Sequence, residues 1–477
     1  MLAISPSHIS SKIFPCSTTS KLILIAYFSL GLGGTSALLA LVMGGRIFSL
    51  SAIATLIVFT DLIIGKKNKK TSLWRLHTSR YFIIWMGISI LSSFWGFAYF
   101  SIVDINFAVA PLTFIPKIGI YLILLYFLSI RENSEIRISF LIKGIIFGVW
   151  FNIIWSICDA TMYYTIGKSL TNTVFKPYIV AADIRYGTAS LEFGSYIRSS
   201  GLNTDPANIG FFAAVGTAYA MVGRKFWLIG ACVLSALSAV SFVGLVGIAL
   251  VIVYELLFGK AIRHRVLFLI IGAIITISAY TYYKHSSQPL ITFLRDAIEL
   301  KAQSKADGDQ STELRSNFIK KFPDAVSHLP SSLIIGTGYY TGVYAYYLEG
   351  VTYYGEYSGR NVPTEMENCY IEYFFDFGLI GFFFFCLFYL QILLNYQKID
   401  RIHPSKTNKS IFAIVLGSII SFCFYHYTLY SVIMFTDVAA IVHLRNIYGK
   451  NKDSKQSRTT DIITECPSGM SKNKSIT

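Results

Sequence analysis

Long apolar stretches separated by short polar segments make up most of the chain. A stretch of about 17–24 apolar residues can cross the ~30 Å hydrocarbon core of a membrane as an α-helix. Backbone amides in lipid find no water to bond, so each such stretch must be helical. The pattern predicts about twelve helices. They are expected at residues 22–43, 46–64, 81–103, 107–130, 139–163, 206–222, 226–239, 242–258, 267–283, 373–395, 411–429 and 431–447.

The composition excludes a soluble globular protein of this size. The 477 residues are 54% hydrophobic and only 14% charged, and their mean hydropathy is +0.55. A soluble fold needs about a quarter of its residues charged to cover its surface. The predicted fold class is therefore an all-α polytopic membrane protein, with the lipid bilayer as its surroundings.

Basic residues indicate the orientation of the helices. The net charge of +15 would suggest nucleic acid as a partner in a soluble protein. In a membrane protein, Lys and Arg instead gather on cytoplasmic loops, so no nucleic acid is expected. The strongest cluster is the segment 66–70, and others include Arg131 with Arg137 and Arg224 with Lys225. Twelve spans with both termini in the cytoplasm place every basic cluster on the cytoplasmic face.

Residues 226–258 are short for two helices. A single span there would move the basic residues at 260–265 to the outer face, against the charge rule. We therefore expect two short or tilted helices that meet near residues 238–241. The first apolar stretch, from Leu22, is too long for the core of a signal peptide and is interpreted as a retained helix.

The predicted organisation leaves two segments on the outer face. The smaller is residues 164–205, between helices that belong to the region 1–283, and the larger is the loop 284–372. Helices follow at 373–447, and the polar, basic tail 448–477 is expected to be disordered. Within the large loop, Thr312 can cap a helix that Pro323 would end.

Arg198 is the first candidate for chemistry on the outer face. It lies shortly before an expected helix in a short outer segment, where the charge rule disfavours a cation. A function would explain its position, and so would a pairing with a lipid phosphate or with Asp205. Arg315, followed by Lys320, lies on the expected helix of the large loop, where an ordinary solvated helix face is the simpler explanation.

Carboxylates and tyrosines mark the end of the large loop. Glu365, Glu367 and Asp376 lie where the chain re-enters the membrane. Partial desolvation there suits a carboxylate to act as a general base, whereas snorkelling to water would need no function. Eight tyrosines in 339–357, with Tyr339 and Tyr340 first, could stack on sugar rings or form an interfacial aromatic belt.

Lys117 lies inside an expected helix at about mid-depth. Ionisable groups in the membrane are costly and usually face an interior cavity. Lys117 could meet an anionic lipid headgroup or pair with Asp159 or Asp437. The seven cysteines are scattered without metal-ligand spacing, so neither disulfides nor a metal site is expected, and no cofactor is implied.

Three segments, in order, resemble the O-antigen polymerase and ligase superfamily, the Wzy-type polymerases in particular. RSSGLNTDPANIGFF (198–212) resembles an Arg-x-x-Gly stretch that leads through Pro-Asn into a helix, although Ala207 separates Pro206 from Asn208 here. ELRSNFIKKFPDAVSHLPSSLIIGTGYY (313–340) resembles a pattern that closes on Gly-x-Gly. MENCYIEYFFDFGLIGFFFF (366–385) resembles a loop exit before a Gly-Leu-Ile-Gly helix start.

The resemblance implies glycosyl transfer at the periplasmic face of the bacterial inner membrane. The donor would be a growing glycan on undecaprenyl pyrophosphate, and the acceptor an incoming lipid-linked repeat unit of a lipopolysaccharide O-antigen or similar polysaccharide. A chain-length regulator is a further expected partner. Arg198 and Arg315 would stabilise the pyrophosphate and Glu367 would act as base, without a metal. The expected substrate-binding residues are Lys117, Asn208, Lys320, Tyr339, Tyr340 and Asn368.

Two alternatives remain open. An O-antigen ligase would transfer the finished glycan to lipid A-core. The ligase branch carries His before the Asn, whereas this chain has Glu367-Asn368, which favours the polymerase. A lipid-linked oligosaccharide flippase or other transporter is the second alternative. Transporters often show internal repeats, and no convincing repeat is present.

Overall fold

The computed structural model describes the helical body and parts of both loops. The described residues are 18–35, 50–64, 76–181, 190–193, 196–203, 206–258, 281, 284–285, 317–339, 341–351, 354–357, 360–363, 368–402, 404–423 and 432–448. The helices of the body are α1 (Thr18–Gly33), α3 (Leu50–Ile64), α4 (His77–Val103), α5 (Ile105–Leu112), α6 (Phe114–Ile130), α7 (Ser134–Ile166), α9 (Ala207–Val222), α10 (Trp227–Ser238), α11 (Phe242–Phe258), α17 (Cys369–Ile402), α18 (Lys406–Ser421) and a last helix at 432–448.

Most of the described helices overlap the expected ones, and the chain is an integral membrane protein, while the expected number of twelve spans stays a prediction. Four described helices are long and apolar enough to cross a membrane, and five shorter apolar helices accompany them. The expected helix at 267–283 lies almost entirely outside the described residues. The all-α expectation holds for the body but not for the loops, because two short antiparallel strand pairs occur there.

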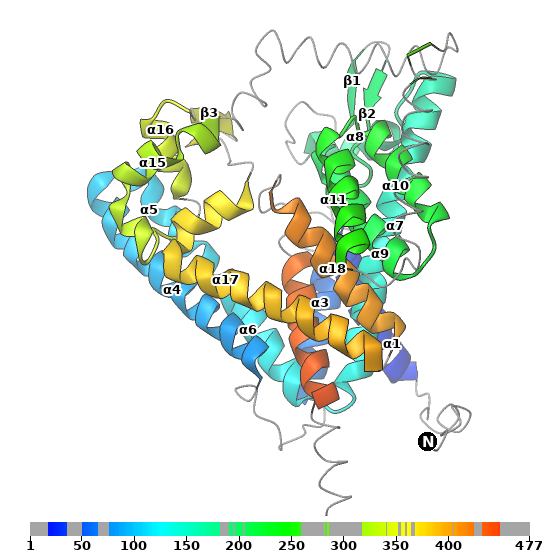
Figure 1. Cartoon of the computed structure of the whole chain (residues 1–477), viewed down its shortest axis with the longest axis horizontal. Helices are drawn as coiled ribbons and strands as arrows, with labels where there is room; N and C mark the ends of the chain where they lie inside the picture. The colour runs from blue at the N-terminus through cyan, green and yellow to red at the C-terminus, as the bar shows by residue number, and fades with distance from the viewer. Residues whose placement is uncertain are drawn as a thin grey trace, which may run out of the picture.

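The bundle has two distinct ends. We call the end that carries Arg131, Arg137 and Lys406 the basic face. The opposite end, which we call the loop face, carries the described residues 190–193, 196–203, 330–339, 341–351, 354–357 and 360–363. In Figure 1 the two parts of the loop face lie at opposite sides of the molecule, and the start of α17 and the end of α18 lie between them in this view.

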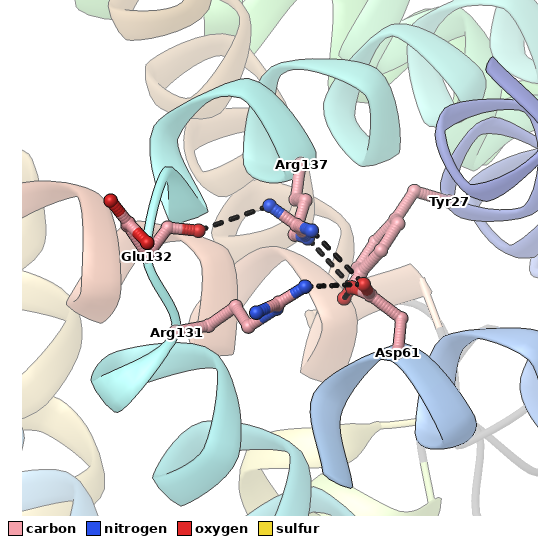
Figure 2. Close-up of polar contacts among 5 residues, drawn as sticks. All are labelled: Tyr27, Asp61, Arg131, Glu132 and Arg137. Carbon is pink, nitrogen blue, oxygen red and sulfur yellow. Dashed lines mark hydrogen bonds and ion pairs between the residues drawn. The ribbon is translucent and has the colours of Figure 1, made fainter. Parts of the chain in front are cut away.

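A buried ionic cluster holds three helices together at the basic face (Figure 2). The carboxylate of Asp61 on α3 accepts hydrogen bonds from Arg131 at 2.7 Å and from Arg137 at 2.7 and 3.0 Å. The Tyr27 hydroxyl of α1 donates to the same carboxylate at 3.2 Å. Only 2% of the Asp61 side chain is exposed. Two arginines expected to set the topology therefore also form buried ion pairs.

Residues 226–258 form two helices, as the charge pattern predicted. α10 ends at Ser238, and a turn at 239–241 leads directly into α11. Val240 in this turn has a φ of 46°, and the Ser241 amide donates to the carbonyl of Ala236 at 2.8 Å. The 12 residues of α10 extend only about 18 Å at 1.5 Å per residue. This helix is therefore shorter than the hydrocarbon core.

The large loop folds into a small domain with its own core. It contains α15 (Phe322–His328), the 3-10 helix η4 (Pro330–Leu333), α16 (Gly342–Leu348) and the paired strands β3 (Tyr354–Tyr357) and β4 (Arg360–Pro363). Phe318, Tyr344 and Tyr346 are buried there against Phe100 and Phe375 of the membrane helices. These two tyrosines are core residues, so neither sugar stacking nor an interfacial belt describes them.

Pro323 begins a helix instead of ending one. The helical turn at 317–320 stops at Lys321, and α15 starts at Phe322 with the proline in its first turn. The missing N–H of proline costs nothing at that position, because the first amides of a helix have no helical partner. Lys321 also contacts Glu349 at 3.2 Å, and His328 contacts Glu349 at 2.7 Å, which joins α15 to the end of α16. These contacts hold the pKa of Glu349 below its ordinary value.

The smaller loop segment is also ordered. It contains α8 (Leu170–Ala181) and a hairpin of β1 (Leu191–Phe193) and β2 (Tyr196–Arg198), in which Leu191 pairs with Arg198. Figure 1 shows this hairpin beside α8 and above α10 and α11.

Candidate functional site

The loop face carries a break in α17 that receives the large loop. At Gly378 the backbone has a φ of 68° and a ψ of 179°, which interrupts the helix. The carbonyls of Phe375 and Asp376 accept hydrogen bonds from the amides of Thr337 and Gly338, both at 2.9 Å. The Ile380 amide donates to the carbonyl of Ile334 at 3.4 Å. Non-helical backbone at membrane depth is stable only when protein satisfies it, and the loop does so here.

Two glycines make this contact possible. Gly336 has a φ of 83° and Gly378 a φ of 68°, a region that residues with a Cβ avoid. A Cβ on Gly378 would lie 2.5 Å from both the Gly336 nitrogen and the Ile334 oxygen, which is closer than real Cβ atoms approach. The Gly-x-Gly of the second motif and the Gly-Leu-Ile-Gly of the third therefore meet in space. The order of the two motifs is visible in the sequence, whereas their pairing is not.

Two carboxylates of α17 are buried near the docked loop, and one of them contacts it. Glu372 and Asp376 are one helical turn apart, and both are fully buried. An oxygen of Asp376 accepts a hydrogen bond from the Thr341 amide at 3.3 Å, and the hydroxyls of Thr337 and Thr341 lie 2.6 Å apart. Asp376 therefore does not snorkel to water. Glu365 and Glu367, the other two expected carboxylates, lie outside the described residues.

Lys117 lies beside the docked loop. Its ammonium is 5.0 Å from the centre of the Tyr339 ring, and that ring stacks on Phe114 with centroids 4.6 Å apart. Such a cation–π contact stabilises a charge without neutralising it. The structure does not show the expected alternative partners: Asp159 accepts from residues of the smaller loop segment, and Asp437 accepts from Tyr389 at 2.8 Å. Lys117 itself is exposed at the side of α6.

Asn368 caps α17. Its side-chain oxygen accepts hydrogen bonds from the amides of Tyr370 at 3.0 Å and Ile371 at 3.2 Å. An Asn at this position satisfies two amides that have no helical partner. The next residue, Cys369, donates its amide to the Phe422 carbonyl at 3.0 Å, which ties the start of α17 to the end of α18. The acceptor of Asn368 is thus committed to the helix start, and binding of substrate by this side chain stays a prediction.

Arg198 ends β2 on the other side of the loop face. Its Nε donates to the carbonyl of Ala239 at 3.4 Å, and the following Ser199 amide donates to Ser238 at 3.0 Å. These contacts hold the arginine against the end of α10. Within the described part of the chain, the two terminal nitrogens of Arg198 make no hydrogen bond or ion pair, so they can serve a ligand. Asp205, its suggested partner, is outside the described residues.

The remaining expected site residues are scattered or outside the described chain. Asn208 is buried in the first turn of α9, and Lys320 is exposed on the turn before α15. Arg315, Glu367 and Tyr340 lie outside the described residues. Among the described residues, no direct contact joins Arg198 to Lys117 and Tyr339. The structure therefore brings Lys117 and Tyr339 together and leaves Arg198 on a separate element.

Sequence reasoning missed Asn152 of α7 and considered Asp159 of the same helix only as a possible partner of Lys117. Asn152 and Asp159 are fully buried, and their spacing of seven residues places them on one face of the helix. Two polar residues at that spacing in an apolar stretch are the signal that could have found them. The groups that donate to their side-chain oxygens lie 10 to 51 residues further along the chain, and Asn152 itself donates to the Thr35 carbonyl, 117 residues earlier, so these pairings could not be read from the sequence.

A comparison with known families supports the resemblance in the motifs. Residues 209–386 match the family described as O-antigen ligase. The match covers α9 to α11, the large loop and the broken first part of α17, and it begins eleven residues after Arg198. No curated protein matches the chain. Residues 209–386 are thus similar to this O-antigen ligase family, which is consistent with the resemblance of the motifs to the O-antigen polymerase and ligase superfamily.

Proposed function

We propose that the protein is a polysaccharide polymerase of the bacterial inner membrane. It would transfer a growing glycan from undecaprenyl pyrophosphate to the sugar hydroxyl of an incoming lipid-linked repeat unit. The loop face would be periplasmic and both termini cytoplasmic. The observation that carries this proposal is the state of Arg198, which is held through its Nε while its terminal nitrogens have no protein partner among the described residues.

The chemistry requires cations more than it requires a strong acid. A pyrophosphate is a good leaving group once its developing charge is stabilised, and a guanidinium can bind two phosphate oxygens at once. Arg198 would supply this contact together with Arg315. Glu367 would accept the proton of the sugar hydroxyl. With two arginines in this role, the proposed reaction uses no metal.

Other residues would bind the lipid-linked oligosaccharide. Lys117 would meet a lipid phosphate, because an exposed ammonium on a membrane helix favours an anionic partner. Tyr339 holds Lys117 beside the docked loop. The other proposed substrate-binding residues are Asn208, Lys320, Tyr340 and Asn368. A chain-length regulator is the proposed protein partner.

Arg198→Ala tests the proposal in cells that depend on this gene. Removing one preorganised charge donor slows catalysis by about 10²–10³-fold. Cells should then carry only single repeat units on their lipid core, while the amount of inserted protein stays normal. Lys176→Ala is the matched control, because Lys176 is another exposed cation of the same loop segment. A normal ladder of chain lengths in Arg198→Ala would remove Arg198 from the mechanism.

The ligase is the second candidate, because the matched family is described as O-antigen ligase. A gene deletion separates the two activities. Loss of a polymerase leaves one repeat unit on the lipid core, whereas loss of the ligase leaves none.

A further inference from the structure

The carboxylate of Asp159 is the centre of a buried hydrogen-bond network near the loop-face end of α7. One oxygen accepts from the Ser169 hydroxyl at 2.7 Å and from the Thr171 amide at 2.9 Å. The other accepts from the hydroxyls of Ser190 at 2.8 Å and Ser199 at 2.6 Å. Asp159 is fully buried, so water does not compete for these four bonds. Hydrogen bonds to a charged acceptor are about twice as strong as neutral ones.

The donors bracket the hairpin that carries Arg198. Ser190 directly precedes β1 and Ser199 directly follows β2, so a single carboxylate oxygen binds both ends of the hairpin. Leu191 pairs with Arg198 at this same end. Arg198 therefore directly precedes Ser199, which binds Asp159. Across the hairpin it pairs with the residue that follows Ser190, the other serine bound to the same oxygen.

A second residue of α7 holds the chain beyond the hairpin. The side-chain oxygen of Asn152 accepts from the Leu202 amide at 3.0 Å and from the Asn203 side chain at 2.8 Å. On the opposite side, the carbonyl of Ser238 at the end of α10 accepts from the Ser199 amide, and the carbonyl of Ala239 in the following turn accepts from the Arg198 Nε. The described residues 190–193 and 196–203 are thus held between α7 and α10, and the terminal nitrogens of Arg198 make no hydrogen bond to any described residue.

We propose that Asp159 is a positioning residue that sets the place of the Arg198 guanidinium through Ser190 and Ser199. This inference rests on the proposed function only for its effect on catalysis, because the effect on the hairpin is structural and can be measured separately. Asp159 would not touch the substrate.

Asp159→Asn is the informative substitution, because it keeps the size of the side chain. The side-chain oxygen of the asparagine can still accept from the backbone amide of Thr171. Its side-chain NH2 group can donate to the hydroxyls of Ser190 and Ser199 once these rotate. The charge is lost, so the hold on the hairpin weakens without a cavity. Ser156→Ala is the matched control. Ser156 is buried on the same helix and lies 2.7 Å from the Ser235 hydroxyl of α10, outside the hairpin network.

The first measurement is hydrogen exchange of the full-length protein in lipid nanodiscs. Asp159→Asn should speed exchange at the amides of residues 190–203 by about 10-fold or more and leave the large loop unchanged. Ser156→Ala should leave 190–203 as in the wild type. Unchanged exchange at 190–203 in Asp159→Asn overturns the inference, whatever the protein's activity is.

The second measurement is the rate of glycan extension in a double-mutant cycle. Asp159→Asn should lower this rate by roughly 10-fold in the wild-type background, because small misplacements of a catalytic group are costly. In the Arg198→Ala background it should cause no further loss. An equal loss in both backgrounds would show that Asp159 does not act through Arg198. If Arg198→Ala has wild-type activity while exchange at 190–203 responds to Asp159→Asn, the proposed function fails and the structural part of the inference stands.

Discussion

Single residues at the basic face show how this membrane protein uses charge. Arg131 and Arg137 were expected there from the charge rule alone, and that rule says nothing about partners. In the structure both bind Asp61, which is almost completely buried between α1, α3 and α7. When a carboxylate and two guanidinium groups are buried together, removing any one of them leaves an uncompensated buried charge, which is strongly destabilising. The cluster therefore fixes the positions of these helices relative to each other.

Asp61→Asn should destabilise the protein by about 3–5 kcal/mol, because it leaves two buried guanidinium groups without their counter-charge. The measurement is thermal unfolding of the purified protein in detergent. Glu132→Gln serves as the control, because Glu132 is exposed and contributes only its backbone carbonyl to Arg137. Equal melting temperatures for Asp61→Asn and the control would show that the cluster does not stabilise the bundle.

Individual elements differ in how well the sequence predicted them. The apolar pattern located α11 at 242–258 without error and α4 within four residues at its start. The thickness of the hydrocarbon core sets the length of an apolar membrane helix, so the apolar pattern alone is enough to predict where such a helix begins and ends. It did not predict the break at Gly378, because apolar residues continue on both sides and only the docked loop makes the break stable. The hairpin of Arg198 and its bonds to Asp159 depend in the same way on residues distant in the chain.

Gly378→Ala should disrupt the contact between α17 and the large loop. Alanine is strained at this φ and ψ, and its Cβ would meet the Ile334 carbonyl at 2.5 Å. The strain alone costs about 1–3 kcal/mol, and the collision adds to it. We expect a lower melting temperature and faster proteolysis of the large loop.

Gly119→Ala provides the comparison. Nothing lies within 4 Å of a Cβ at this position of α6. In a helix interior, alanine is more favourable than glycine by about 0.5–1 kcal/mol. A Gly378→Ala protein as stable and as protease-resistant as Gly119→Ala would contradict the described docking.

At the scale of the whole molecule, the two loop segments have different supports. The large loop is docked on α4 and α17, whereas the Arg198 hairpin is held by α7 and α10. Between them lies the start of α17, which Asn368 caps and α18 supports (Figure 1). This arrangement places the proposed pyrophosphate cation and the Lys117 side of the bundle on different elements. The proposed reaction needs two binding sites, one for the lipid-linked donor and one for the lipid-linked acceptor, and these two elements could each provide one.

Extension of lipid-linked repeat units by the purified protein in vesicles is the sharpest test of the proposed polymerase activity. The wild type should join units into longer chains on undecaprenyl pyrophosphate and release free undecaprenyl pyrophosphate in proportion to the bonds formed. The Arg198→Ala protein should form these products at least 100-fold more slowly. Wild-type protein that moves repeat units across the bilayer without lengthening them, or extension at the same rate without Arg198, would contradict the proposed activity and the role of Arg198 in it.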